Sequence, residues 1–201
     1  MKNLQLSRPH LLVMVGIVGS GKTTFANKFA DTFQAPIINN TKISNVVSEL
    51  DNYNNKADKI IKDLLYIQLD QLLKTNCTIV ADIDSHTRSD RMALTAKAKE
   101  YGYETIFIWA QIDQLTAKQR SMNLKSKNSI SADQFDRLIK NFTAPSNNEN
   151  TLVISGKHTY ASQAKVVLRR LSASRTENAK KQSVPERISP SLNSRHSINI
   201  T

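Results

Sequence analysis

The chain has 201 residues, which is enough for one domain with a substantial core and too few for two ordinary domains. Its net charge of +11 favours polyanions as partners, whether nucleotide, nucleic acid or anionic surface, although a solvated basic surface would give the same charge. The one cysteine, Cys77, excludes an intrachain disulfide, and nothing indicates a thiolate zinc site or an oxidising compartment. No stretch is apolar over the length of a membrane span or a secretory signal, so we expect a cytoplasmic protein with no membrane insertion.

The first predicted strand and helix enclose a glycine-rich segment. Residues 11–15 are apolar throughout and predict a buried strand, and residues 24–33 place three phenylalanines at helical spacing. Between them, Gly16 to Thr24 matches the phosphate-binding pattern G-x-x-x-x-G-K-[ST], in the order strand, loop and helix that the chemistry needs. Such a loop turns successive backbone N–H groups toward one anion at a positively polarised helix end. The sequence therefore predicts a nucleoside triphosphate site.

Two side chains of this loop have specific expected roles. Lys22 can reach the outer phosphates, and the Thr23 hydroxyl can hold Mg²⁺. The residues that we expect to bind the nucleotide are Gly16, Gly19, Ser20, Gly21, Lys22, Thr23 and Thr24.

The rest of the chain alternates predicted strands and helices. Further strands are expected at 35–38, 78–81, 104–109 and 151–155, and helices at 57–73, 88–101, 115–127, around 135–142 and at 160–171, with a polar stretch at 39–43. Continuous apolar strands that alternate with helices are typical of a parallel sheet covered on both faces. We therefore expect an α/β P-loop NTPase fold with a five-stranded parallel sheet sandwiched by helices and with a helical lid.

The composition changes at about Ser172. Residues 172–201 are rich in serine, contain prolines and an excess of basic residues, and show no apolar period. We therefore expect a disordered basic tail after a folded domain of residues 1–171. The tail could contact nucleic acid or a membrane surface, be phosphorylated, or only add solubility.

An acidic residue closes the third predicted strand. Asp82 would lie at the carboxyl edge of the sheet, where open parallel sheets bind ligands, and we expect it to hold Mg²⁺ with Thr23 or to orient a nucleophile. Asp84 and His86 follow at alternate positions. A metal site made from Asp82, Asp84 and His86 is one alternative, and helix capping by Asp84 or Ser85 is another.

Arginines outside the glycine loop supply further positive charge. Arg120, in the polar helix expected to form the lid, would neutralise the charge that spreads over a transferring phosphoryl group, unless this helix is only a solvated surface. Arg88 and Arg91 begin the helix after Asp82, where positive charge is unfavourable, which favours a phosphate-binding use on the acceptor side. The expected catalytic residues are Lys22, Asp82 and Arg120.

Taken together, Gly16 to Thr24, Asp82 to Arg91 and Arg120 resemble the small P-loop kinases of the polynucleotide kinase and zeta-toxin group, a group related to AAA-type ATPases. The segment Phe142-Thr-Ala-Pro-Ser-Asn-Asn-Glu149 is similar to that group's Phe-x-x-Pro-x-x-x-Glu signature. The likeness covers residues 11–171.

The resemblance implies that the chain binds ATP with Mg²⁺ and phosphorylates a hydroxyl on a nucleic acid end, a nucleotide sugar or a small molecule. It also implies that Lys22 and Thr23 grip the β- and γ-phosphates and Mg²⁺, and that Arg120 acts from the lid. Kinases of the group usually carry an aspartate just after the second strand, and an arginine three residues on, to activate and position the acceptor hydroxyl. This chain has Asn39 to Ser44 there, without a carboxylate.

Two functions follow from these features. The first is an ATP-dependent kinase acting on a hydroxyl, such as the 5′ end of a polynucleotide. Asp82 or Asp84 could then substitute for the missing base, since phosphoryl transfer depends mostly on positioning and charge neutralisation. The second is a catalytically weak nucleotide-binding module that uses ATP as a switch while its basic surface contacts nucleic acid or a partner.

Overall fold

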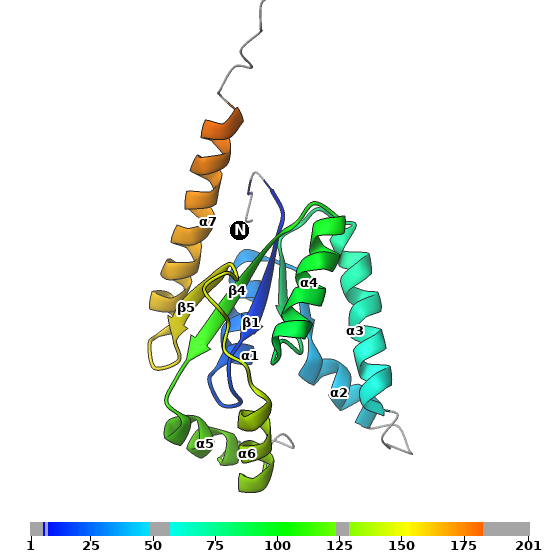
Figure 1. The fold of residues 1–201 in the computed structure, drawn as a ribbon, viewed down its shortest axis with the longest axis vertical. Helices are drawn as coiled ribbons and strands as arrows, with labels where there is room; N and C mark the ends of the chain where they lie inside the picture. Colours follow the sequence, from blue (N-terminus) through cyan, green and yellow to red (C-terminus); the bar gives the residue numbers. More distant parts are fainter. Residues whose placement is uncertain (1–5, 7, 49–56, 124–128, 183–201) are drawn as a thin grey trace, which may run out of the picture.

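Five parallel strands form one sheet with helices on both faces (Figure 1). The computed structural model describes residues 6, 8–48, 57–123 and 129–182. The strands are β1 (His10–Val15), β2 (Ile37–Asn39), β3 (Ile79–Asp82), β4 (Glu104–Gln111) and β5 (Thr151–Ser155), in the order β2-β3-β1-β4-β5. The helices are α1 (Lys22–Phe33), α2 (Asn40–Ser48), α3 (Ala57–Leu73), α4 (Arg88–Glu100), α5 (Gln114–Met122), α6 (Ala132–Asn141) and α7 (Tyr160–Gln182). The predicted α/β fold is confirmed.

The central strand β1 shows why the apolar runs predicted a covered sheet. All six of its residues are buried. Leu11 and Val13 pack into the core on one face, and Leu12 and Met14 pack into the core on the other. Because successive residues of a strand point to opposite faces, an unbroken apolar strand is stable only where both faces are covered.

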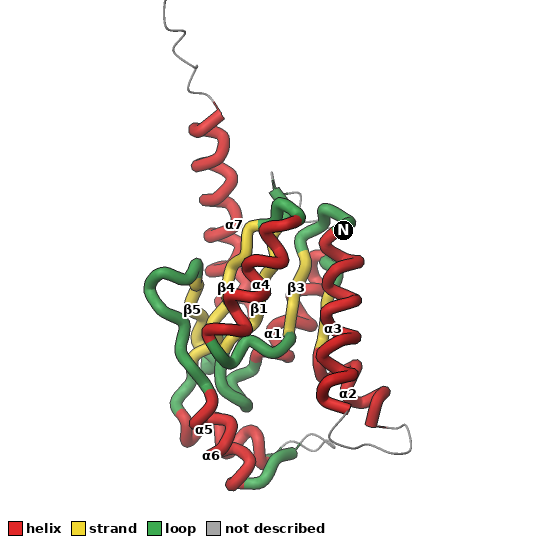
Figure 2. Tube along the Cα trace, turned by 45° about the vertical axis from the view of Figure 1, so that its right-hand side comes forward, coloured by secondary structure: helices red, strands yellow, loops and turns green. Residues whose placement is uncertain are grey.

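Two pairs of helices cover the two faces of the sheet (Figure 2). On one face, α3 and α4 bury apolar residues one helical turn apart, such as Leu65 and Leu69 of α3. On the other face lie α1 and α7, and the rings of Phe25 and Phe29 in α1 stack with their centroids 5.4 Å apart. The spacing of the phenylalanines therefore predicted the buried side of α1 correctly.

Two elements differ from the sequence-based expectation. The polar stretch after β2 forms a helix, α2. The last helix does not end at Leu171 but continues to Gln182, because residues 172–182 contain good helix formers and no glycine or proline. The expected boundary between domain and tail thus falls inside α7, and residues 183–201 lie outside the described part of the chain. Within the described residues, no helix combines the length and the apolar character that crossing a bilayer requires.

The connection from β4 to β5 is unusual because its helices do not cover the sheet. Helices α5 and α6 lie beyond the carboxyl edge of the strands, at the bottom of Figure 1. Residues 142–150 then return to the start of β5 without forming a helix. The predicted lid is therefore helical, but α5 ends at Met122, and residues 124–128 of its predicted range lie outside the described residues.

Candidate functional site

The glycine loop joins β1 to α1 and leaves the first turn of that helix open to a ligand. Gly21 caps α1 with a φ of +94°, in the left-handed region that glycine adopts at little cost. No side chain caps this end, and no acidic residue stands in the first turn. Since the first N–H groups of a helix have no partner within the helix, those of Lys22 to Thr24 are available to an anion.

Neighbouring elements pack closely against this loop. A Cβ at Gly19 would lie 2.2 Å from the carbonyl oxygen of Ala117 in α5, so only glycine allows α5 to sit this near. A Cβ at Gly156, in the turn after β5, would lie 2.6 Å from the carbonyl oxygen of Ser20. The loop is therefore held between the lid helix and the turn that follows β5.

Lys22 turns its ammonium group into the loop. Its Nζ donates hydrogen bonds to the carbonyl oxygens of Gly16, at 2.8 Å, and Ile17, at 2.9 Å. Burial lowers the pKa of Lys22, while the negative charges of Asp82 and Asp84 oppose that shift. The two carboxylates favour the protonated form of Lys22, and its ammonium has a third N–H with which to bind an anion such as the outer phosphates of a nucleotide.

Asp82 and Thr23 meet beside this ammonium. The Asp82 side chain lies at the end of β3, where the residue is only 7% exposed, and burial raises its pKa. A hydrogen bond from the Thr23 side chain and the charge of Lys22 oppose that shift. A hydroxyl and a carboxylate at one point are the hard oxygen ligands that Mg²⁺ takes, so this pair fits the cation. In the described part of the chain no group of three His, Cys, Asp or Glu residues could hold a metal, so the alternative site with Asp84 and His86 gains no support.

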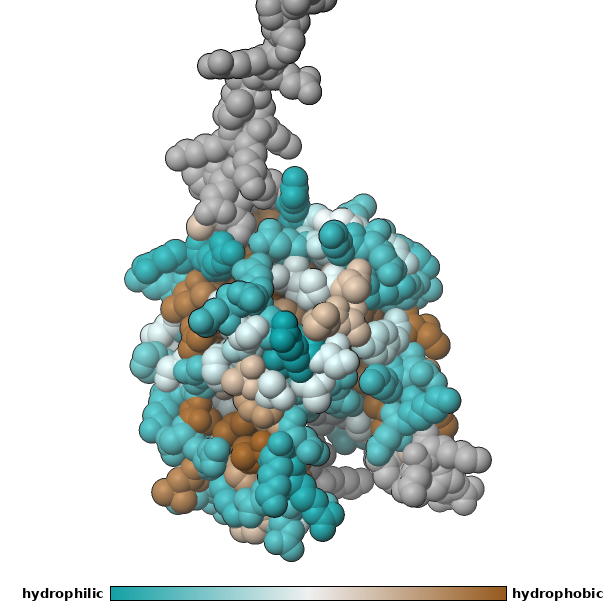
Figure 3. All heavy atoms as spheres, in the orientation of Figure 1, coloured by the Kyte–Doolittle hydropathy of each residue, from teal (hydrophilic) through white to brown (hydrophobic). Residues whose placement is uncertain are grey.

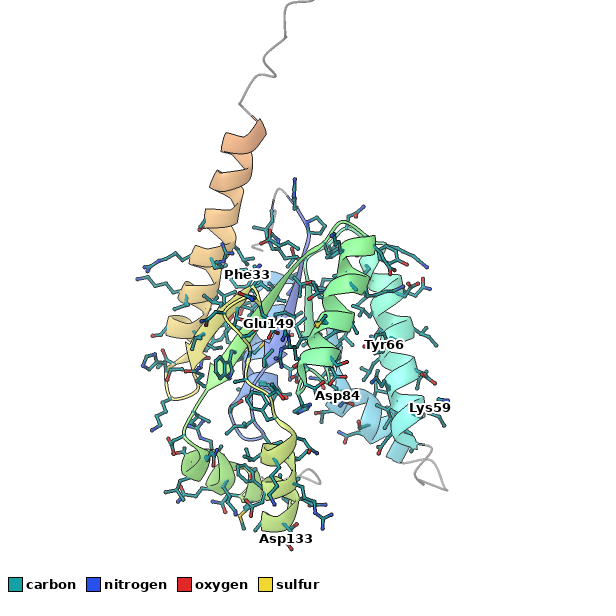
Figure 4. The ribbon with its side chains drawn as sticks, in the orientation of Figure 1. Phe33, Lys59, Tyr66, Asp84, Asp133 and Glu149 are labelled. Carbon is teal, nitrogen blue, oxygen red and sulfur yellow. The ribbon has the colours of Figure 1, made fainter. Side chains whose placement is uncertain are left out.

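The end of β2 carries amides in place of the carboxylate that the resemblance to kinases led us to expect. Asn39 Nδ2 lies 3.5 Å from Asp82 Oδ2, and its Oδ1 accepts a hydrogen bond from the backbone of Lys42. Asn40 Nδ2 donates to Asp84 Oδ1 at 3.2 Å. Figure 4 shows Asp84 at the carboxyl edge of the sheet, near the start of α4. Asp82 and Asp84, at the carboxyl edge of the sheet, are therefore each contacted by a neutral amide.

Arg91 does not face an acceptor, contrary to the expectation from sequence. Its side chain is fully buried and forms a two-point ion pair with Glu149, with Nε–Oε2 at 2.5 Å and Nη2–Oε1 at 3.1 Å. The remaining N–H groups donate to the backbone carbonyls of Ser85, Thr143 and Ala144. All five donors of the guanidinium are used, so Arg91 fastens the return segment at 142–150 to α4. Arg88, by contrast, is exposed, and its acceptor role stays a prediction.

Arg120 and the last residues of the loop complete the site. Arg120 Nη1 donates to the carbonyl oxygen of Gly156 at 2.9 Å, which places this lid cation beside the turn that contacts the loop. The Ser20 hydroxyl is buried and makes no hydrogen bond within the described residues. The backbone N–H of Ser20 donates a hydrogen bond to the carbonyl oxygen of Ile17. Thr24 is exposed at the start of α1. Nucleotide contacts of Ser20 and Thr24 stay predictions.

The comparison with known families decides the classification. The family model described as "Chromatin associated protein KTI12" matches residues 10–152, which is more than half of the chain. The chain belongs to the KTI12 family. The match covers β1, the glycine loop, Asp82, both lid helices and the return segment, so every part of the site except the turn after β5 lies within it.

Solved structures share the fold of this KTI12-family chain at low sequence identity. The Kti12 of Chaetomium thermophilum in complex with ADP-AlF3 is 17% identical, has a TM-score of 0.65, and is matched over 81% of this chain and 98% of that one. A gluconokinase from Sinorhizobium meliloti is 18% identical with a TM-score of 0.63, over 88% of this chain and 98% of that one. A sugar kinase from a Janibacter species is 16% identical with a TM-score of 0.61, over 84% and 97%. No curated protein sequence matches the chain. The fold is therefore that of the small P-loop kinases, as the resemblance implied.

Some site residues of this KTI12-family chain could not be identified from the sequence. Gly156 and Ala117 contact the glycine loop through backbone atoms, and no motif marks them. Glu149 was part of the Phe-x-x-Pro-x-x-x-Glu signature, but only the structure shows that its partner is Arg91. The sequence around Arg91 does not indicate that this arginine is buried, and it does not indicate which acidic residue pairs with it.

Proposed function

We propose that this KTI12-family chain binds ATP with Mg²⁺ in the glycine loop and transfers the γ-phosphate to a hydroxyl. The observation that carries the proposal is the convergence of Lys22, Thr23 and Asp82 at the uncapped N-terminus of α1. The Kti12 of Chaetomium thermophilum was solved with ADP-AlF3, which supports a nucleotide at the corresponding place in this chain.

The residues of the site have complementary roles in this reaction. Thr23 and Asp82 would hold Mg²⁺, which draws charge from the β- and γ-phosphates when bound. Lys22 neutralises the outer phosphate oxygens, and the free N–H groups of α1 bind the inner ones. Arg120 approaches from α5 and stabilises the charge on the phosphoryl group as it moves from ADP to the acceptor oxygen.

A second function, a nucleotide-dependent switch, is favoured by the amides at the end of β2. Asn39 and Asn40 have no pKa suited to a general base. In this second function the chain binds ATP but transfers its γ-phosphate inefficiently. The family is described as chromatin associated, which favours nucleic acid or a nucleic-acid-bound protein as the partner of the basic surface. The family description favours a location in the nucleus. The cytoplasmic location that the sequence led us to expect stays a prediction.

One experiment separates the two functions. The protein is incubated with γ-labelled ATP and Mg²⁺ and with a panel of hydroxyl acceptors that includes nucleic acid 5′ ends, sugars and nucleosides. Label on an acceptor supports the kinase. ATP binding without label on any acceptor, and with release of inorganic phosphate only when nucleic acid is added, supports the switch. The absence of any ATP binding by folded protein contradicts both.

A further inference from the structure

An imidazole follows β3 on the turn that leads into α4. His86 lies in this turn, residues 83–87, at the same edge of the sheet as Asp82 and Asp84. The backbone of His86 is fastened from outside the turn, because its carbonyl oxygen accepts a hydrogen bond from Thr143 N at 2.9 Å. The side chain is 31% exposed. His86 is therefore a group on a fixed backbone that a ligand can reach.

The surface beside this turn is recessed. Figure 3 shows a hollow between the lid helices α5 and α6 and the part of the molecule that carries α2 and α4. Figure 4 places Asp84 at the border of that hollow, near the start of α4. The side chain of Asp84 is 51% exposed. A molecule that enters the hollow from solvent therefore meets the turn that carries Asp84 and His86.

Charged groups from several elements act on the imidazole of His86. Burial lowers its pKa most, the ammonium of Lys22 lowers it further, and nearby carboxylates oppose both effects. With a pKa below the ordinary 6.5, the imidazole is neutral near pH 7 and can take up a proton. The charged groups that face it are Lys22 of α1, Asp82 of β3, Asp84 of the turn and Asp90 of α4, and Asp90 is itself paired with Lys62 of α3.

Asp84 is placed to orient this imidazole. Asp84 Oδ1 lies 3.9 Å from His86 Nδ1 and accepts a hydrogen bond from Asn40 Nδ2 at 3.2 Å. Asn40 Oδ1 accepts a hydrogen bond from Ser44 Oγ at 3.0 Å, so side chains of α2 support the carboxylate. A carboxylate opposite Nδ1 favours the tautomer that carries its proton on Nδ1. The lone pair of His86 Nε2 is then free to accept a proton.

We propose that His86 is the general base of this chain, and that its Nε2 takes the proton of the acceptor hydroxyl. The inference rests on the proposed function, since it adds a catalytic residue to that same site. The acceptor oxygen forms a bond to the γ-phosphorus while the bond from this phosphorus to the bridging oxygen of ADP breaks. ADP leaves with the electron pair of the broken bond. The hydroxyl proton moves to His86 Nε2 and from there to solvent.

A base after β3 compensates for the carboxylate that is missing after β2. Asn39 is paired in register with Asp82 across the parallel strands β2 and β3, so groups that follow the two strands share one edge of the sheet. The amides of Asn39 and Asn40 cannot take up a proton near neutral pH. Asp82 holds Mg²⁺ in the proposed function. In this proposal, Asp84 is the positioning residue and His86 the residue that accepts the proton.

The tautomer of His86 gives a test that needs no turnover. Proton–nitrogen correlation spectra of nitrogen-15-labelled protein distinguish a proton on Nδ1 from one on Nε2, and loss of signals in His86→Gln assigns the residue. Near neutral pH we expect Nδ1–H in the wild type and a shift toward Nε2–H in Asp84→Ala. Asp63→Ala, at an exposed position of α3, should keep the wild-type tautomer. Wild-type His86 protonated on Nε2 would overturn the proposal, because that nitrogen then has no lone pair.

Turnover gives the second measurement. Release of phosphate from γ-labelled ATP is followed with water as the acceptor and with a deoxyadenosine decamer that has a 5′ hydroxyl. We expect His86→Gln to slow both about 10²-fold and to leave the Kd for ATP unchanged in calorimetry. The wild-type rate should rise with pH through a pKa below 6.5, since only the neutral imidazole accepts a proton, and His86→Gln should lack this rise. Asp63→Ala should keep the wild-type rate and its pH profile.

The outcomes separate a failure of the base from a failure of the proposed function. A wild-type rate and pH profile in His86→Gln would overturn the base alone, as would normal wild-type turnover with a proton on His86 Nε2. Wild-type protein that binds ATP but transfers phosphate neither to water nor to the decamer would contradict the proposed function and the base together.

Discussion

At the scale of single residues, the proposed nucleotide binding depends most on the side chain of Lys22. Its ammonium lies between backbone carbonyls and near two carboxylates, with a pKa lowered by burial. A group in that position gains strongly from a nearby polyphosphate, because the phosphate oxygens replace weaker neutral acceptors.

Lys22→Ala should therefore weaken ATP binding. Charge-assisted hydrogen bonds contribute about 1.5–3 kcal/mol each, so we expect the Kd to rise roughly 10²-fold in isothermal calorimetry. Lys28→Ala, an exposed lysine of the same helix, should bind ATP like the wild type. Near-normal affinity of Lys22→Ala would show that the loop does not bind the triphosphate as described.

The Arg91–Glu149 pair is a residue-scale feature with a stability role. Glu149→Gln leaves the guanidinium buried opposite a neutral amide, and we expect the free energy of unfolding to fall by about 3 kcal/mol. Glu100→Gln changes a carboxylate that is 63% exposed and paired with Lys97, and it should change stability by less than about 1 kcal/mol. Urea denaturation measures both, and equal effects of the two substitutions would contradict the structural role of the pair.

The same pair predicts a dependence on pH. Arg91 lowers the pKa of the Glu149 carboxyl below its ordinary value of 4.5. A carboxyl with a lowered pKa in the folded state stabilises the fold above its ordinary pKa, and this contribution is lost as the pH falls through the lowered value. The difference in unfolding free energy between wild type and Glu149→Gln should thus be largest near neutral pH and shrink as the pH falls below about 4.5. A difference that stays constant to pH 3 would be evidence against the ionised pair.

At the scale of elements, the position of α5 depends on the absence of a side chain at Gly19. Gly19→Ala adds a methyl group 2.2 Å from the carbonyl oxygen of Ala117 and requires a φ of +79°. Gly102→Ala requires a nearly equal φ of +76° but has open space around it, so it is a control for backbone strain alone. We expect about 1 kcal/mol of destabilisation from Gly102→Ala and clearly more from Gly19→Ala, which should also weaken ATP binding. Equal melting temperatures of the two variants would argue against close packing of α5 on the loop.

Helix α5 also carries the proposed transition-state cation. Arg120→Ala should leave ATP binding nearly unchanged and slow turnover about 10³-fold, because a lid arginine acts on charge that develops only during transfer. Arg137→Ala, an exposed arginine on the neighbouring helix α6, should leave turnover unchanged. A normal rate for Arg120→Ala would remove this residue from the mechanism.

At the scale of the whole molecule, the sequence predicted the sheet, its helices and the phosphate loop because these features depend on local patterns. The apolar run before Gly16 and the phenylalanines after it gave strand, loop and helix without further information. Asp82 was placed next to Thr23 for a general reason, since the carboxyl ends of parallel strands meet at one edge.

The features that the sequence did not predict depend on contacts between distant segments. Arg91 was expected at the acceptor because an arginine at a helix N-terminus is unfavourable. Its position is instead stabilised by the ion pair with Glu149, which is 58 residues away in the sequence. The helix at Asn40–Ser48 has few strong helix formers, and its packing against α3 through Ile43 and Val47 stabilises it instead. The end of α7 was placed too early because a tail rich in charge resembles both an exposed helix and a disordered segment.

The buried arginine also links two regions that move separately in many enzymes with lids. Through Arg91, and through the hydrogen bond from Thr143 N to His86 O, the chain that descends from α6 is tied to the turn between β3 and α4. That turn carries Asp84 and begins at Asp82. The position of the segment that follows α6 is therefore coupled to that of the two carboxylates at the end of β3, so in the proposed reaction a displacement of one would be transmitted to the other.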